Sequence, residues 1–294
     1  MKIPVCHTIQ EIEAFLTEQK DSKFCLYLAD KTEDEWEKST SRVYMNQINK
    51  HLVYLPVNIK KDDYQLIEDI YRLSEKTSPI VAINQTQPHK SNPVLKQWAK
   101  GKNIPKNVDA LVKDQNGCLQ FFDLNGASFA DWFEAEVGDF ENKQVVILGV
   151  GGVGEPIARK IVERHPKNLQ LVDVVSKKNL ADELSATYEA KLESVSLYSQ
   201  NIIFINCAGK EGASEAGITD FLQKHKDKEN IFIDLRPHLN IEIVEIAKNM
   251  GWRSYTGFGM NARNDYTLLS KICELIHIKP PAFEDFQKLV ALAS

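Results

Sequence analysis

Short apolar runs alternate along this chain with stretches that repeat apolar residues at helical spacing. In the first half, residues 23–29 (KFCLYLA), 51–59 (HLVYLPVNI) and 79–84 (PIVAIN) predict buried strands. Between the last two, residues 64–76 (YQLIEDIYRLSEK) predict a helix with one apolar face. This alternation is typical of an α/β domain in which helices cover a largely parallel sheet.

A different pattern follows in the middle of the chain. Residues 107–123 (NVDALVKDQNGCLQFFD) predict a β-hairpin, because their Asn-Gly pair favours a tight reversal. Residues 128–138 (SFADWFEAEVG) predict a short helix with Ser128 as its N-cap and Gly138 near its end.

The second half of the chain predicts another α/β unit. Residues 144–165 (QVVILGVGGVGEPIARKIVERH) predict a buried strand, a glycine-rich turn and a helix. Residues 169–175 (LQLVDVV), 201–209 (NIIFINCAG) and 230–237 (NIFIDLRP) predict further buried strands, with helical stretches between them. The expected arrangement is a doubly wound parallel sheet.

Composition limits the classes of function. The chain has 294 residues, enough for two domains, with 43% hydrophobic and 26% charged residues. Its formal net charge is -5 and it has no long basic run, which argues against nucleic acid or a membrane surface as partner. The N-terminus lacks the apolar core of a signal peptide, and no apolar run approaches the roughly 20 residues of a membrane span. We therefore expect a cytoplasmic protein with a small-molecule partner.

The cysteines predict neither a metal site nor a disulfide framework. They are scattered, odd in number and contain no C-x-x-C pair. Three of them lie in apolar runs and are expected to be buried, which fits a reducing compartment. The cysteines are Cys6, Cys25, Cys118, Cys207 and Cys273, and the three expected in the core are Cys25, Cys207 and Cys273.

The glycine turn GVGGVG follows a strand and opens a helix, the context that a dinucleotide-binding fingerprint requires. Its first glycine permits a tight turn, its second lets backbone approach a pyrophosphate, and its last allows close helix–strand packing. The helix N-terminus then offers amide N–H groups to the phosphates. The alternative is a turn that serves packing alone. The residues expected to contact a dinucleotide here are Gly149, Gly151, Gly152, Val153 and Gly154.

Asp173 ends the next predicted strand, about 20 residues downstream, where an acid binds the adenosine ribose hydroxyls. A carboxylate there disfavours the additional phosphate of NADP, so we expect NAD as the cofactor. Lys177 and Lys178 follow closely and keep NADP as an alternative.

Another polar group lies at the end of the strand predicted at 79–84. Residues 82–94 read AINQTQPHKSNPV, so Asn84, Thr86, His89 and Lys90 follow the apolar run. Strand ends carry ligand-binding groups in α/β folds. Taken alone, Lys90 is either a solvated surface lysine or part of a site.

Six segments, in order, resemble the shikimate dehydrogenases and their quinate/shikimate relatives over about residues 39–260. The family pattern N-x-T-x-P-[HF]-K is complete here as NQTQPHK, which favours a catalytic role for Lys90. The other segments are VDALV (108–112), FDLNGASF (122–129), GVGGVG (149–154), NCAGKEG (206–212) and GFGMNARN (257–264).

The resemblance implies a fold with two domains that have different roles. Residues 1–124, completed by helices in 262–294, would form a substrate-binding catalytic domain, and residues 125–261 a Rossmann NAD(P)-binding domain. The implied activity is an NAD(P)-dependent alcohol dehydrogenase of the shikimate dehydrogenase type, acting on shikimate or a related small hydroxylated carboxylate. The resemblance also implies substrate-binding roles for Ser39, Ser41, Thr86 and Asn264, and cofactor-binding roles for Asn206, Cys207, Gly257 and Met260.

The catalytic residues depart from the family pattern. The family sets a lysine beside an aspartate at the reacting hydroxyl, but the aspartate position falls on Asn125, whose amide cannot take a proton at neutral pH. The family's asparagine in VNT falls on Asp109, so the two residue types look exchanged. Asp109 is therefore the first candidate for the carboxylate partner of Lys90. Asp123 is the second, because it would point to the same side of a strand as Asn125.

Two readings of function remain open. The first is an oxidoreductase of this family in which Lys90 is the acid/base. The second is a shikimate dehydrogenase-like nucleotide-binding protein, with an altered substrate or without turnover, which the change at Asn125 favours. In either case we expect a monomer or a homodimer and no metal.

Overall fold

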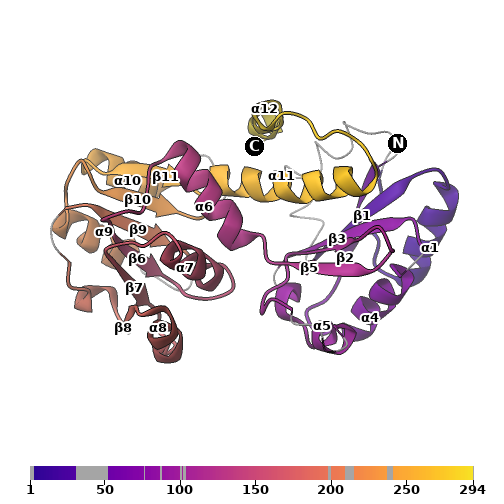
Figure 1. Ribbon diagram of the computed structural model, residues 1–294, viewed down its shortest axis with the longest axis horizontal. Coiled ribbons are helices and arrows are strands. Elements are labelled where there is room, and N and C mark those ends of the chain that lie inside the picture. The colour runs from indigo at the N-terminus through magenta and orange to yellow at the C-terminus, as the bar shows by residue number, and fades with distance from the viewer. Residues whose placement is uncertain are drawn as a thin grey trace. The chain divides into compact units, whose positions relative to one another are not determined.

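The computed structural model describes residues 3–30, 52–75, 77–86, 88–99, 101, 104–197, 200–208, 215–236 and 241–293. The chain divides into two compact units (Figure 1). Unit 1 comprises Met1–Leu124 with Asp265–Ser294, and unit 2 comprises Asn125–Asn264. Among the described residues, no helix combines the length and the apolar composition needed to cross a lipid bilayer.

Unit 1 contains a mixed five-stranded sheet in the order β2-β1-β3-β4-β5. The first three strands in this order are parallel, and β4 and β5 form the antiparallel hairpin that the Asn-Gly turn predicted. The strands are β1 (Lys23–Ala29), β2 (Leu52–Asn58), β3 (Ile80–Gln85), β4 (Ala110–Lys113) and β5 (Leu119–Phe122).

The two faces of this sheet have different chemistry. One face packs on α1 (Ile9–Glu18), α4 (Tyr64–Leu73) and α5 (Pro93–Trp98) in the main core of the unit. The strand register places Tyr54, Tyr27 and Asn84 together on the other face. There, Lys271 of α11 (Phe258–Leu275) lies 4.2 Å from the centre of the Phe122 ring, and Figure 1 shows the end of α11 on the side opposite α4 and α5. The chain ends with α12 (Phe283–Ala293).

Unit 2 contains a parallel six-stranded sheet in the order β11-β10-β9-β6-β7-β8. Counted from its own first strand, this is the order 3-2-1-4-5-6 of a Rossmann fold. The predicted α/β class with a doubly wound nucleotide-binding sheet is therefore confirmed. The strands are β6 (Gln144–Leu148), β7 (Asn168–Val172), β8 (Thr187–Glu189), β9 (Ile202–Asn206), β10 (Ile231–Asp234) and β11 (Arg253–Thr256).

Helices cover both faces of this sheet, and the unit has two apolar cores. One core includes residues of α6 and α7, and the other includes residues of α9 and α10. The helices of the unit are α6 (Asn125–Glu136), α7 (Gly154–Val162), α8 (Lys178–Leu184), α9 (Glu215–Lys224) and α10 (Glu242–Asn249), and α11 begins in it.

The predicted start of α6 is wrong. The helix begins at Asn125, so Ser128 lies inside its first turn, buried, and its hydroxyl has no hydrogen-bond partner among the described residues. The earlier start follows from packing against α7. A Cβ atom at Gly126 would lie 2.5 Å from the carbonyl oxygen of Pro156, so the glycine lets the two helices approach closely.

The predicted strand at 169–175 is too long. β7 ends at Val172, and the side chains of Val174 and Val175 are 82% and 64% exposed. The cause is Asp173, whose Oδ1 accepts a hydrogen bond from the Val175 N–H at 2.8 Å and turns the chain out of the sheet. A carboxylate that bonds backbone two residues later favours a turn over a strand.

Candidate functional site

Buried polar side chains anchor the segment that follows β3. The Gln85 side chain accepts a hydrogen bond from the Tyr71 hydroxyl at 2.9 Å and donates one to the Val108 carbonyl at 2.8 Å. The fully buried His89 ring lies with Nε2 3.1 Å from the Ile59 carbonyl oxygen. Burial lowers the pKa of His89, so the ring is neutral at neutral pH and Nε2 donates to that oxygen.

Asn92 completes this anchor and begins the next helix. Its Oδ1 accepts from the Leu95 N–H at 3.2 Å as the N-cap of α5, and its Nδ2 donates to the His89 carbonyl at 2.6 Å. Lys90 lies between His89 and Asn92, in a single 3-10 turn spanning His89–Ser91. Its main-chain carbonyl also accepts from the Val108 N–H at 2.7 Å. The backbone of Lys90 is therefore fixed on both sides.

Lys90 and Asp109 form an ion pair. Lys90 Nζ lies 2.5 Å from Asp109 Oδ1, and the two side chains are 14% and 3% exposed. The second carboxylate oxygen of Asp109 accepts from the Leu124 N–H at 2.7 Å. A charge with so little exposure must be paired and hydrogen-bonded to be tolerated, and both conditions are met. The contact expected between these two residues is therefore present.

Other polar groups lie near the end of β3. Asn84 Nδ2 donates to the hydroxyl of the fully buried Tyr54 at 2.5 Å. Thr86 is half-buried, and its main-chain N–H donates to the Leu28 carbonyl at 2.9 Å. The predicted substrate residues Ser39 and Ser41, and Arg42 beside them, lie outside the described residues.

The expectation that Asp123 and Asn125 share one side of a strand is wrong. β5 ends at Phe122, Asp123 lies half-buried in the link that follows, and Asn125 opens α6. Asn125 is buried in unit 2, and its Oδ1 accepts from Asn264 Nδ2 at 3.1 Å. These two residues are the first and last of that unit, so their amides join the two ends of its chain segment.

The glycine turn of unit 2 has the geometry that the fingerprint requires. Gly149 has φ +84°, and a Cβ there would lie 2.6 Å from the Ala208 nitrogen. A Cβ at Gly154 would lie 2.1 Å from the Gly149 carbonyl oxygen, so the helix start packs against the turn. At Gly151 a Cβ would meet nothing within 4 Å, so this backbone is open to an approaching ligand. The three glycines therefore serve a tight turn, close packing and access.

Asp173 holds this turn from the neighbouring strand. Its Oδ2 accepts from the Val150 N–H at 2.7 Å, while Oδ1 accepts from the Val175 N–H. A carboxylate has about four acceptor positions, so these bonds leave room for ribose hydroxyls. The position at the carboxyl end of β7, beside the turn, is where a Rossmann fold binds the adenosine ribose.

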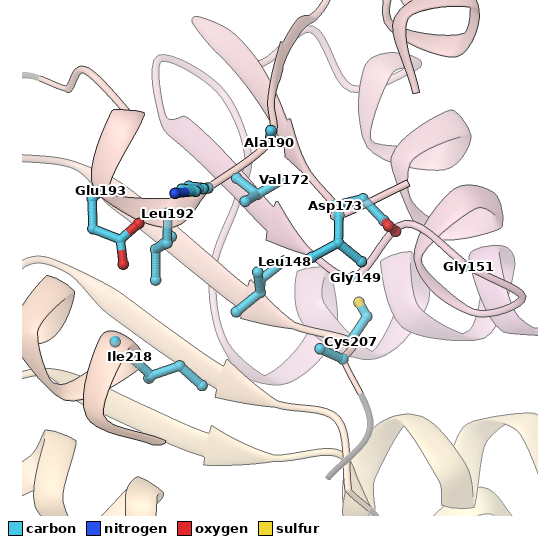
Figure 2. Close-up of a pocket in the computed structure, with 14 residues that line it drawn as sticks. Leu148, Gly149, Gly151, Val172, Asp173, Ala190, Leu192, Glu193, Cys207 and Ile218 are labelled. Atoms are coloured by element: carbon cyan, nitrogen blue, oxygen red, sulfur yellow. The ribbon is translucent and has the colours of Figure 1, made fainter. Parts of the chain in front are cut away.

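A cavity of about 720 Å³ opens at the carboxyl ends of β6, β7 and β9 (Figure 2). This is the place where the strand order reverses and where open α/β sheets bind ligands. Of the predicted cofactor residues, Gly149, Gly151, Asp173 and Cys207 line it. The sequence did not indicate the remaining lining residues, Leu148, Val172, Val174, Ala190, Lys191, Leu192, Glu193, Ala208, Gly217 and Ile218.

The other predicted cofactor residues do not line this cavity. Met260 is 6% exposed and packs in the apolar core that contains α6 and α7. Gly257 lies against the residue that follows β10, where a Cβ would be 2.2 Å from the Leu235 carbonyl oxygen. Asn206 is buried and hydrogen-bonded at the end of β9. Gly152, Val153 and Gly154 are likewise not among the lining residues.

One feature of α7 opposes an anion at its N-terminus. Glu155 lies in the first turn, where its negative charge already interacts with the partial positive charge of the helix N-terminus. Its Oε1 pairs with Arg159 at 3.2 Å, one turn along the helix, and Arg159 also bonds Glu183. The Glu155 charge is therefore compensated within the protein.

The described residues contain no group of three or more histidine, cysteine or acidic side chains arranged to hold a metal ion.

Comparison with known proteins gives one sequence relative and many structural ones. No family model matches the chain. A curated shikimate dehydrogenase (NADP(+)) from Methanococcus vannielii is 25% identical over 149 residues, 50% of this chain and 51% of the relative. The matched part thus spans about half the length of that protein.

The structural matches cover nearly the whole chain. Shikimate dehydrogenase from Aquifex aeolicus matches with a TM-score of 0.70 and 14% identity, over 92% of this chain and 97% of its own. Quinate dehydrogenase from Corynebacterium glutamicum, solved with NAD, matches with a TM-score of 0.71 and 15% identity, over 92% and 99%. A 5-ketofructose reductase of Gluconobacter sp. matches with a TM-score of 0.71 and 18% identity, over 93% and 99%. The chain resembles shikimate dehydrogenases in sequence and has the fold of this group of oxidoreductases.

Proposed function

We propose that this chain is an NAD(P)-dependent oxidoreductase of the shikimate dehydrogenase type, which interconverts a secondary alcohol and a ketone on a small hydroxylated carboxylate. The observation that carries the proposal is the ion pair of Lys90 with Asp109, held at a strand end in a chain that also contains a Rossmann cavity. A lysine beside a carboxylate is the acid–base pair that the chemistry needs.

Lys90 is the proposed acid/base. In its amine form Nζ accepts the hydroxyl proton of the alcohol, and in its ammonium form it returns a proton to the ketone oxygen. Asp109 orients Nζ through the 2.5 Å contact and stabilises the ammonium that forms. A nicotinamide bound in unit 2 would supply the acceptor for the hydride. The scheme gives Asn125 no acid–base role, because a side-chain amide neither takes up nor releases a proton near neutral pH.

The cavity residues favour NAD over NADP. Asp173 has acceptor positions for ribose hydroxyls, and Gly151 leaves its backbone accessible. Two carboxylates, Asp173 and Glu193, line the cavity against one lysine, Lys191, so an extra phosphate would meet net negative charge. Titration of both cofactors by calorimetry tests this preference. NADP binding tighter than NAD by about tenfold, or about 1.4 kcal/mol, would overturn it.

The resemblance supports a proposal for the class of substrate. The names of the relatives include shikimate, quinate and 5-ketofructose, so the fold is compatible with several polyhydroxylated compounds. We propose shikimate or a closely related hydroxylated carboxylate, because the segment NQTQPHK is complete. Thr86 is the proposed hydrogen-bonding partner of the substrate near Lys90.

A panel assay tests the activity. NADH or NADPH formation would be followed with shikimate, quinate and other small hydroxy acids, and the reverse direction with the corresponding ketones. Lys90→Ala is expected to lower kcat by about 10²–10⁴-fold and to leave the Kd of the cofactor unchanged. Lys96→Ala, at an exposed lysine of α5, is the matched control. Wild-type turnover in Lys90→Ala would exclude Lys90 as the acid/base.

A second candidate function is a nucleotide-binding protein without turnover. It is favoured by Asn125, an amide where the family has a carboxylate, and by the use of one Asp109 oxygen in holding the Leu124 N–H. Tight cofactor binding without oxidation or reduction of any compound in the panel would select this function instead.

A further inference from the structure

A buried carboxylate lies at the carboxyl ends of β9 and β10, beside the cavity but outside its lining. Asp234 is the last residue of β10, has no exposed surface, and pairs in register with Asn206, the last residue of β9. A buried charge is costly unless it is paired and hydrogen-bonded. The mechanism proposed above gives this residue no role.

The Asp234 carboxylate is saturated with donors. Oδ1 accepts from Arg236 Nε at 2.8 Å and from the Arg236 main-chain N–H at 3.1 Å. Oδ2 accepts from Arg236 Nη2 at 2.9 Å and from Asn206 Nδ2 at 2.8 Å. Two of these bonds form a bidentate arginine–carboxylate pair, an arrangement that fixes orientation as well as charge. The side chain of Asn206 is therefore held in one orientation.

That orientation matters for the turn after β9. With its Nδ2 committed to Asp234, Asn206 presents Oδ1 to the Ala208 N–H at 3.2 Å. The Ala208 nitrogen is the atom that a Cβ at Gly149 would meet at 2.6 Å. Cys207 and Ala208 both line the cavity, and Figure 2 shows Cys207 beside Gly149. Hydrogen bonds therefore connect Asp234, through the Asn206 side chain, to the Ala208 nitrogen, which packs against the glycine turn.

The same carboxylate is linked to a third strand end. The Arg236 carbonyl accepts from the Gly257 N–H at 3.0 Å, where β11 gives way to α11. The Leu235 N–H donates to the Asn206 carbonyl at 3.0 Å. The ends of β9, β10 and β11 are thus tied together around Asp234. Burial raises the pKa of the Cys207 thiol, and the neighbouring Asp234 carboxylate contributes to that rise, in keeping with their proximity.

We propose that Asp234 is a positioning residue for the dinucleotide cavity: through Asn206 it fixes the Cys207–Ala208 turn against the glycine turn, and so sets the width of the site between them. The proposal rests on the cofactor function proposed above. Sites of this kind lose affinity when the residues behind their walls are loosened, because the productive geometry is then no longer maintained.

The chain offers a matched control at the other end of the same strand pair. Asn230 is fully buried, its Oδ1 accepts from the Ile202 N–H at 2.9 Å, and its Nδ2 donates to the His225 carbonyl at 2.8 Å. It connects β9 to the start of β10 far from the strand ends that form the cavity. Its loss should lower stability without moving the cavity wall.

The experiment compares Asp234→Asn, Asn206→Ala and Asn230→Ala by denaturant unfolding and by NADH affinity. Asp234→Asn and Asn206→Ala are expected to weaken NADH binding by at least about tenfold, while Asn230→Ala loses stability and keeps the wild-type Kd. Asn206→Ala retains the Asp234–Arg236 pair, so it remains informative if Asp234→Asn does not fold. Unchanged affinity in Asn206→Ala, or an equal loss in Asn230→Ala, would overturn the proposal.

A second measurement separates this proposal from the proposed function. The alkylation rate of Cys207 by iodoacetamide, read by mass spectrometry, reports the turn without any cofactor. Asn206→Ala should raise it by at least about tenfold, since that change keeps the Asp234 charge but releases the turn. If the wild-type protein binds neither NADH nor NADPH, the cofactor function fails. The Cys207 rate then decides alone, and a rate unchanged by Asn206→Ala overturns the positioning role.

Discussion

Replacing Asp109 by asparagine tests the proposed acid–base pair most directly. The change is nearly isosteric, but it removes the charge opposite Lys90 and one of two acceptor oxygens. In the wild-type protein, one carboxylate oxygen contacts Lys90 Nζ and the other accepts from the Leu124 N–H. In the variant, the single remaining oxygen can accept from only one of these two donors. One buried donor is then left without its partner, which by itself costs about 1–3 kcal/mol.

The size of the effect follows from the burial of the pair. At a separation of 2.5 Å, the gross attraction is about 7 kcal/mol at an effective dielectric constant of about 20. Desolvation offsets much of that, and removal of one partner from a buried pair costs about 3–5 kcal/mol. Because the Lys90 side chain is still 14% exposed, we expect a loss near the lower end, about 3 kcal/mol.

The assay is urea unfolding combined with steady-state kinetics. A double-mutant cycle with Lys90→Met should give a coupling free energy of about 1–3 kcal/mol, and Asp109→Asn should lower kcat by about 10²-fold or more. Asp114→Asn is the matched control, since Asp114 accepts from the Asn116 and Cys118 N–H groups in the turn at the other end of β4. Coupling below about 0.5 kcal/mol together with unchanged kcat would refute the reasoning.

Three further predictions concern other buried or reactive groups. Burial lowers the pKa of His225, with Lys224 as a second cause, so the unfolded chain takes up a proton at a higher pH than the folded protein does, and the unfolding free energy falls as pH drops below about 6.5. His225→Gln should flatten this fall between pH 7.5 and 5.5, by about 1.4 kcal/mol per unit of pKa difference at most. Burial also lowers the pKa of Lys113 to about 8, with Lys23 as a second cause, which means that folding disfavours its charged form. Lys113→Met should therefore raise the Tm at pH 7. An unchanged or lower Tm would contradict this prediction. Among the five thiols Cys118 is the exposed one and Cys207 is half-buried, so iodoacetamide at neutral pH should label Cys118 faster than the other four before unfolding, as mass spectrometry would show.

Elements with a strong local signal could be predicted from the sequence. The apolar run of β1 and the Asn-Gly turn between β4 and β5 each indicate one structure, and both are present. The short edge strands β8 and β11 were missed because their residues are half-buried or exposed and form no apolar run. The start of α6 was missed because it depends on packing of Gly126 against α7, a contact between segments distant in sequence.

In the candidate site too, residues with a local sequence signal could be predicted, whereas those that depend on contacts between distant segments could not. The glycine turn and Asp173 could be found because their spacing is fixed by one strand–turn–helix unit. The contact of Lys90 with Asp109 was expected from the resemblance, and the structure contains it, whereas its catalytic role stays a prediction. The Asp234 cluster carried a weaker signal. Polar residues end two predicted buried strands, but only the pairing of β9 with β10 shows that they meet.

The division of the chain also bears on how the protein is made. Unit 2 is one continuous segment, Asn125–Asn264, whereas unit 1 needs both Met1–Leu124 and Asp265–Ser294. During synthesis, domains fold as their residues leave the ribosome. Unit 2 therefore has its whole sequence available while unit 1, although begun first, still lacks Asp265–Ser294, the segment whose Lys271 contacts the Phe122 ring. Residues 265–294 can complete unit 1 only after all of unit 2 has been synthesised, so the two units become complete in the reverse of the order in which they begin.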